Sequence, residues 1–218
     1  MSSRKRKQQV KEMGKIAEEK YRARIRAYEE IQELIKSGFD EELAARIRQA
    51  AAKKSDLAFF DEYGYSILHV AAENDRAKAV ALLVREAGFD VDIRSNFKRT
   101  SLHAAATCGA AKAAQTLISL GAEADARNGD GNTPMQRAAC YAKETNDKKL
   151  ETIRVLLDAG ANPHAKDDFR LEPINWFKTK QAQRCFLTLI GEERDDLLPR
   201  VMFIYDSDGQ IILAVRDE

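Results

Sequence analysis

The first sixty residues place their apolar side chains at helical spacing. Between Val10 and Ile35 these side chains recur every three or four positions, which forms a single narrow stripe along one face of a long helix. Ser37-Gly38 ends the stripe, and Asp40 is placed to cap a second helix. Residues 1–60 are therefore expected to form a long helix that continues into a helical hairpin and caps the rest of the chain.

Beyond Asp61 the pattern of apolar and polar positions repeats. The segment Ser66-Ile67-Leu68-His69-Val70-Ala71-Ala72 returns at Thr100, Thr133 and, with less similarity, Glu172, at spacings of 34, 33 and 39 residues. A polar insertion before Leu150 accounts for the longer third spacing. A second landmark, a pair of Leu or Ile residues, comes after each copy at Leu82-Leu83, Leu117-Ile118, Leu156-Leu157 and Leu189-Ile190. Two landmarks that recur in phase predict stacked helix pairs.

These landmarks resemble those of ankyrin repeats, in which the first helix opens on a T-P-L-H-x-A-A pattern and the second ends in an L-L-x-x-G-A turn. The resemblance covers about Asp61 to Gly191, with three good copies and one degraded copy. It implies repeats at residues 61–94, 95–127, 128–166 and 167–191. It also implies that the imidazoles of His69 and His103 form hydrogen bonds inside the stack and do not serve as metal ligands or bases.

Residues 192–218 do not share the repeat pattern. After an acidic loop, Val201 to Tyr205 and Gln210 to Val215 flank the turn-like segment Asp206-Ser207-Asp208-Gly209, which predicts a β-hairpin. A lone hairpin is marginal in water, so it would pack on the last repeat or pair with another chain. The expected fold class is therefore an all-α ankyrin-repeat solenoid with an N-terminal helical-hairpin cap and a short C-terminal β-hairpin.

The charge is near zero overall but unevenly distributed. The formal net charge is +1, yet the chain up to Arg26 has a net charge of +7 and the chain from Gly191 onward has a net charge of −5. The basic run Arg4-Lys5-Arg6-Lys7 has two interpretations, a solvated helix end or a nuclear import or nucleic-acid contact. Aromatic residues are sparse around it, which argues against single-strand binding.

Other compositional features bear on the compartment and on chemistry. Three widely spaced cysteines, Cys108, Cys140 and Cys185, do not form a disulfide framework and favour a reducing compartment. No apolar run approaches the roughly 18 residues that span a bilayer. Asp206-x-Asp208 lacks the glycine of a calcium loop, and no nucleophile–base signature is visible. We expect a cytoplasmic protein, or alternatively a nuclear or translocated one, that is not an enzyme and holds no cofactor or metal.

The resemblance also implies where a partner protein binds. In such stacks the contacts come from the turn tips and the exposed parts of the first helices. By register these residues are Glu62, Tyr63, Tyr65, Glu73, Asn74, Asn96, Phe97, Arg99, Thr107, Cys108, Asp130, Asn132, Cys140, Tyr141, Asp168 and Phe169. The aromatic residues among them suit an interface, although packing between neighbouring tips is the alternative. The insertion at Lys143 to Lys149 is expected to form a protruding loop.

A protein-interaction module is thus the leading hypothesis. Two alternatives are a secreted bacterial effector that binds a host protein and a nuclear regulator that uses the basic N-terminal segment. Neither a nucleic acid nor a membrane is the expected partner. Self-association through the C-terminal hairpin or the N-terminal helix stays open.

Overall fold

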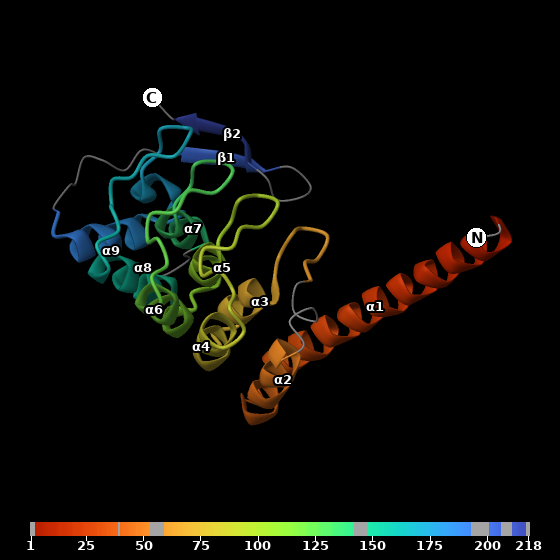
Figure 1. Ribbon diagram of the computed structural model, residues 1–218. Coiled ribbons are helices and arrows are strands. Elements are labelled where there is room, and N and C mark those ends of the chain that lie inside the picture. Colours follow the sequence, from red (N-terminus) through yellow and green to blue (C-terminus); the bar gives the residue numbers. More distant parts are fainter. Residues whose placement is uncertain are drawn as a thin grey trace.

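The molecule is a row of helix pairs stacked side by side. The computed structural model describes residues 3–38, 40–52, 59–141, 148–192, 201–205 and 211–216. Figure 1 shows the pairs succeeding one another in sequence order, from α1 and α2 at one end to α9 at the other.

Three central pairs carry the repeat pattern. They are α3 (Ile67–Glu73) with α4 (Ala77–Arg85), α5 (Ser101–Cys108) with α6 (Ala111–Ser119), and α7 (Pro134–Tyr141) with α8 (Lys148–Asp158). The first helices α3, α5 and α7 pack on one another in one layer, and the second helices α4, α6 and α8 form the other. Leu68, Leu102 and Met135 are fully buried between them. Fully buried alanines on each first helix let neighbouring pairs approach closely, so stacking buries apolar surface that a single pair would expose.

The start of each first helix is held by a pair of residues three positions apart. The Thr100 N–H donates to Nδ1 of His103 over 3.2 Å, and the Ser66 N–H makes the same bond to His69. In the third repeat the Thr133 N–H donates to the Gln136 side-chain oxygen over 2.8 Å. These bonds satisfy backbone N–H groups that the helix leaves without an internal partner.

The last pair is shorter than the others. The residues after Glu172 form a 3₁₀ helix, η1 (Pro173–Trp176), and α9 (Lys180–Ile190) completes the pair. Phe177 ends η1 in an extended conformation, and both Trp176 and Phe177 are buried. Bulky side chains thus close the stack at a position where the other repeats have Val70, Ala104 and Arg137, then alanine.

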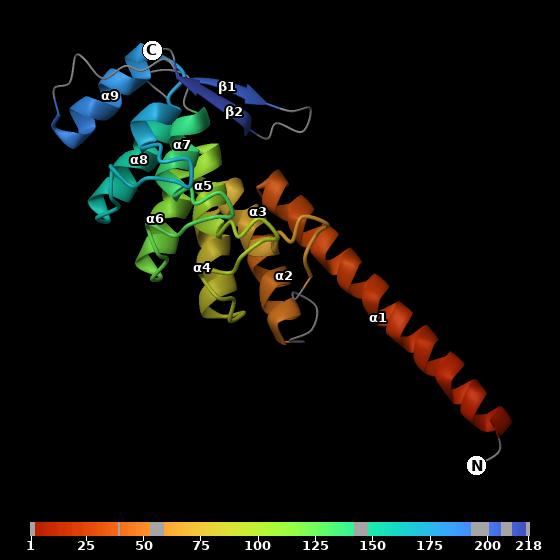
Figure 2. The same ribbon diagram turned by 90° about the horizontal axis from the view of Figure 1, so that it is seen from above.

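The N-terminal cap has the layout of a further pair. α2 (Asp40–Ala52) packs on α4, and the C-terminal part of α1 (Ser3–Ser37) packs on α3. Tyr28, Ile31 and Ile35 of α1 belong to the same buried apolar core as the repeats. α1 therefore takes the place of a first helix, and its N-terminal part runs well beyond the stack (Figures 1 and 2).

Arg76 fastens this cap to the first repeat. Its Nε donates to the Ile35 carbonyl over 2.7 Å, and its Nη2 reaches the Lys36 carbonyl at 3.5 Å. The last carbonyls of a helix have no partner inside the helix, so a guanidinium is well suited to satisfy them.

The substitution Arg76→Ala is expected to loosen the cap. Losing a charge-assisted hydrogen bond to a helix end costs roughly 2 kcal/mol. Amide hydrogen exchange should therefore become faster in α1 from residue 27 to residue 36 and in α2, but not in α5. Arg85→Ala, at an exposed arginine of α4, is the control. Unchanged exchange in α1 and α2 would show that Arg76 does not hold the cap.

The expected fold class needs correction at the C-terminal end. Over the described residues, the regular elements from α1 to α9 are all helical, and no hairpin belongs to this stack. β1 (Val201–Tyr205) and β2 (Ile211–Arg216) pair only with each other, antiparallel and with an irregularity between Ile204 and Tyr205. The predicted turn, Asp206 to Gly209, lies outside the described residues. The two strands are short apolar runs rich in β-branched residues and do not add another helix pair, so "all-α" describes the stack and not the whole chain.

Candidate functional site

The candidate site is built on four equivalent loops, which we call the fingers. They are residues 61–65, 95–99, 128–132 and 167–171, each directly before a first helix. The first residue of each finger binds its own loop: Asp61 Oδ1 accepts the N–H groups of Tyr63 and Tyr65 over 2.9 and 2.7 Å. Asn128 and Asp167 make the same pair of bonds, and the Ser95 hydroxyl accepts one, from Arg99. Each finger therefore has one local conformation.

The fourth residue of each finger adopts a left-handed backbone. Gly64 and Gly131 have φ values of 76° and 73°, and Lys98 and Arg170 have values of 56° and 62° at the matching positions. Glycine adopts this conformation without strain, whereas other residues do so rarely. The same turn is therefore built in all four fingers despite different sequences.

Backbone hydrogen bonds join each finger to the next. The Asn96 N–H donates to the Tyr63 carbonyl over 3.0 Å, and the Gly129 N–H donates to the Phe97 carbonyl over 2.8 Å. The Asp168 N–H donates to the Asp130 carbonyl over 3.3 Å. Figure 1 shows the loops side by side along one edge of the stack. The four fingers are thus linked into one continuous surface and are not independent loops.

The third residue of each finger lies at its tip and faces solvent. Tyr63, Phe97 and Phe169 are 52%, 41% and 53% exposed, and Asp130 occupies the matching position of the third finger. Three exposed aromatic rings along one edge are costly to leave in water and well suited to contact another protein.

The second finger is stiffened by contacts between its side chains and those of the first. The Arg99 guanidinium lies 5.5 Å from the centre of the Phe97 ring and donates to the Tyr65 hydroxyl over 3.1 Å. The Tyr65 ring meets the His69 ring edge to face, with centroids 5.0 Å apart. The predicted contact residues Tyr65 and Arg99 are accordingly half-buried, and Arg99 contacts the Phe97 ring while Tyr65 accepts a hydrogen bond from Arg99.

The deeper predicted residues are more enclosed than the tips. Asn132 and Cys140 are 2% exposed, and the Asn132 carbonyl accepts a hydrogen bond from Nε2 of His103 over 2.9 Å. The side chains of Asn74 and Thr107 bond to carbonyls of their own helices. The side chain of Tyr141 and residues 143–147 of the predicted insertion loop lie outside the described residues, whereas Lys148 and Lys149 of that segment begin α8. Glu62, Asn96, Glu73, Cys108 and Asp168 are exposed.

The Cys108 thiol is exposed but held in its protonated form. Partial burial raises its pKa to about 11, and the neighbouring Glu73 carboxylate adds to the rise by repulsion and by a hydrogen bond. Two predicted contact residues from adjacent repeats thus meet at one point of the face. The thiolate is the reactive species, so this cysteine is a poor nucleophile despite its exposure.

Alkylation measures this effect. At pH 8, iodoacetamide should modify Cys108 about 100-fold more slowly than it modifies an exposed thiol of ordinary pKa, because the thiolate fraction falls with the raised pKa. Glu73→Gln should accelerate the reaction, and unfolding in denaturant should restore the ordinary rate. The rate at the Cys108 peptide, measured by mass spectrometry, decides the point. A rate equal to that of the unfolded chain would contradict the assigned pKa.

A second set of bridges, which joins neighbouring repeats just before the fingers, was missed from the sequence. The Arg94 guanidinium donates to the Arg127 carbonyl over 2.7 Å, and Arg127 donates to the Lys166 carbonyl over 2.7 Å. Two residues earlier, Asp92 and Asp125 accept N–H groups of Glu123 and Asn162 in the next repeat. The signal was present as an Asp-x-Arg triplet that recurs 33 residues apart.

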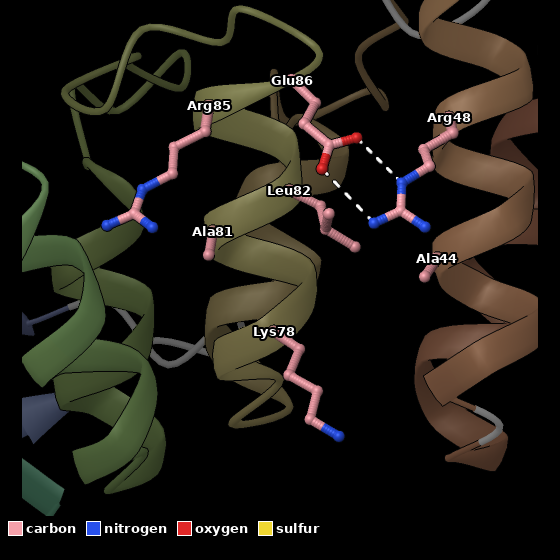
Figure 3. Close-up of a pocket in the computed structure, with 7 residues that line it drawn as sticks. All are labelled: Ala44, Arg48, Lys78, Ala81, Leu82, Arg85 and Glu86. Atoms are coloured by element: carbon pink, nitrogen blue, oxygen red, sulfur yellow. Dashed lines mark hydrogen bonds and ion pairs between the residues drawn. The ribbon is translucent and has the colours of Figure 1, made fainter.

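A hollow of about 350 Å³ lies apart from the fingers, between α2 and α4. Ala44 and Leu82 point toward each other across it, and the Arg48–Glu86 ion pair spans one end (Figure 3). Lys78, Ala81 and Arg85 complete the lining. None of these residues was predicted to bind a partner, and the hollow lies on the second-helix side of the stack.

The described part of the chain offers neither a metal site nor a membrane span. Within it, no three or more His, Cys, Asp or Glu side chains gather closely enough to share a metal ion. No helix within the described ranges is both long and apolar enough to cross a membrane.

Known proteins share the repeat pattern of this chain. A family model described as ankyrin repeats, in three copies, matches residues 23–128 and 68–167. The Neurogenic locus notch homolog protein 1 of Xenopus laevis and that of Homo sapiens are each 35% identical over 117 residues, 53% of this chain and 4% of theirs. The Neurogenic locus notch homolog protein 2 of Homo sapiens is 33% identical over 138 residues, 62% of this chain and 5% of its own length. The chain thus aligns with about one twentieth of these curated relatives.

Proposed function

Because this chain belongs to the ankyrin-repeat family, we propose that it is a non-catalytic module that binds a partner protein through the finger tips and the first helices. Ankyrin repeats are generally protein–protein interaction modules, and the family is generally non-enzymatic. We further propose the division into a cap (1–60), repeats (61–191) and a C-terminal segment (192–218), with contacts at the predicted residues.

The row of exposed aromatic tips carries this proposal. Tyr63, Phe97 and Phe169 occupy the same position in three fingers, and each ring is more than 40% exposed. Aromatic side chains supply large contact areas with few rotatable bonds. The main-chain bonds between fingers hold the tips before any partner arrives, so little conformational entropy is lost on binding.

A comparative pull-down tests the proposal. The wild type and the triple variant Tyr63→Ala, Phe97→Ala, Phe169→Ala are used as baits in lysate of the source cells, and captured proteins are identified by mass spectrometry. A partner held by the wild type should be reduced at least about tenfold by the variant, since each hot-spot aromatic contributes more than about 1 kcal/mol.

The matched control carries three alanine substitutions on the second helices, at the exposed residues Lys112, Gln115 and Arg154. It should keep the partner, and circular dichroism should show equal helicity for all three proteins. Equal capture by the wild type and the finger variant would overturn the proposal that the tips are the working surface.

A further inference from the structure

The N-terminal part of α1 extends the apolar face by which that helix docks on the stack. At about 100° per residue, Ala17, Tyr21 and Tyr28 lie within about 40° of one another around the helix. Tyr28 is 6% exposed where α1 meets the stack, whereas Tyr21 is 55% exposed and Ala17 is exposed. Val10 and Met13 continue the same stripe by register. We call residues 3–23 the arm and this stripe its seam.

The arm runs past the first finger and away from the stack (Figures 1 and 2). The centroids of the Tyr21 and Phe59 rings lie 6.1 Å apart, and those of the Tyr28 and Phe59 rings lie 5.1 Å apart. The seam is thus continuous with an interface that is already packed. The family match begins at residue 23, so the arm is an addition to the repeats.

The seam has a basic border. Lys7, Lys11 and Lys20 flank it by register, Arg6 and Arg24 fall inside it at the angle between Met13 and Ala17, and Glu18 is the acidic residue on that side. The Glu18 carboxylate pairs with Arg22 over 2.7 Å, which offsets its charge. Glu12 and Glu19 fall on the opposite face of the helix. A partner helix on the seam would therefore be flanked by positive charge.

We propose that the arm binds an acidic amphipathic helix of a partner protein, which lies along the seam as the second strand of a short coiled coil. A stripe of about one apolar residue per turn is the width of a coiled-coil seam and narrower than the face that a helix buries in a membrane. Glutamates flanking the partner's own seam would meet the basic border. This proposal does not depend on the finger face.

Charge argues against a second copy of the arm as the occupant. Residues 3–23 contain eight Lys or Arg and three Glu, so two arms side by side would bring together two helices of net charge +5 each. Like charges across a coiled coil oppose pairing, whereas opposite charges select the partner.

The test uses a defined probe with the full-length protein. The probe is a fluorescein-labelled three-heptad peptide with leucine at the seam positions and glutamate beside them, and anisotropy reports its binding. The reference peptide replaces every glutamate by lysine. At about 0.15 M salt, where charges farther apart than about 8 Å are screened, the acidic peptide should bind at least tenfold more tightly than the basic one.

Two matched pairs of variants locate the site on the helix. Ala17→Glu, on the seam, should weaken binding at least about tenfold, whereas Ala23→Glu, also at an exposed alanine but about 120° away, should leave it within about twofold. Lys20→Glu, on the border, should weaken binding several-fold more than Lys15→Glu, which lies on the far face. All four substitutions retain good helix formers.

Several results would overturn the proposal. Equal losses of peptide affinity within either pair of variants would show that binding arises from unspecific electrostatic attraction and not from the seam. Binding of vesicles that contain phosphatidylserine, or of duplex DNA, without binding of the acidic peptide would assign the arm to a membrane or a nucleic acid. Self-association in sedimentation equilibrium that Ala17→Glu abolishes, without peptide binding, would assign it to a second copy.

The two proposals can fail separately. The triple finger variant should bind the acidic peptide as the wild type does, and Ala17→Glu should still capture a partner that depends on the fingers.

Discussion

Trp176→Ala is expected to lower the free energy of unfolding of the C-terminal end of the stack by about 3 to 5 kcal/mol. The Trp176 side chain is 1% exposed and its Nε1–H donates to Asp167 Oδ2 over 2.9 Å. The same Asp167 carboxylate holds the N–H groups of Phe169 and Leu171, so the indole fixes the fourth finger as well as filling the core. Removing it leaves a cavity and deprives a buried carboxylate of a donor.

Urea unfolding monitored by circular dichroism measures this loss, because Trp176 is the chain's single tryptophan and its fluorescence disappears with it. Trp176→Phe keeps most of the apolar volume and removes the hydrogen bond, so it should cost less. Phe169→Ala, at a ring that is 53% exposed in the fourth finger, is the surface control and should cost under about 1 kcal/mol. A loss below about 1 kcal/mol in Trp176→Ala would mean that the last repeat does not depend on the indole.

The stacked helix pairs were predictable because two independent patterns had to agree. The capping pairs recur at about the same spacing as the Leu and Ile residues near the end of each second helix, and only stacked pairs satisfy both. His69 and His103 were assigned from their register to hydrogen bonds inside the stack, and their Nε2 atoms do reach the Arg99 and Asn132 carbonyls of the next finger. Residues that bond to the next copy therefore recur at a fixed position in each repeat, and that position predicts their hydrogen bonds.

Features that depend on distances between repeats were not predictable in the same way. Asn132 aligns with the exposed side of a finger, yet it is 2% exposed because its N–H and carbonyl bond to Asn128 and His103. The third finger has Asp130 where the others have an aromatic tip, and register alone does not say how this changes the face. The 3₁₀ form of η1 depends on how Trp176 and Phe177 fill the end of the core, which is a question of shape.

The predicted fold class was wrong for the residues after the last repeat, where the repeat pattern ends. The two apolar runs between Val201 and Val215, separated by a turn-like segment, indicate strands, but they do not say whether the strands join the stack. The two strands bond only to each other, and the division of the chain that was drawn around them remains a prediction.

The stability of the stack is expected to fall between pH 7 and pH 4 because of His103, by about 3 kcal/mol from this one side chain. Burial lowers the pKa of His103 from 6.5 to about 3. Its Nδ1 accepts the Thr100 N–H and its Nε2 donates to the Asn132 carbonyl, so the folded state requires the neutral ring. Below pH 6.5 the His103 imidazole is protonated in the unfolded chain but stays neutral in the folded chain. The contribution is therefore complete above pH 6.5 and is lost as the pH falls toward 3. The pKa of His69 is lowered by the same cause, which adds to the effect.

The third repeat supplies the matched control for His103. Gln136 occupies the equivalent position, where its side-chain oxygen accepts the Thr133 N–H and its Nε2 donates to the Leu171 carbonyl over 2.7 Å. An amide thus makes both bonds of the imidazole and does not titrate. His103→Gln should be close to the wild type at pH 7 and gain about 3 kcal/mol relative to it at pH 4. Carboxylates titrate alike in both proteins, so the difference between their urea midpoints isolates the imidazole. Parallel pH profiles would show that His103 is not held neutral, and the bond from its Nδ1 to the start of α5 would then not be what fixes the second repeat.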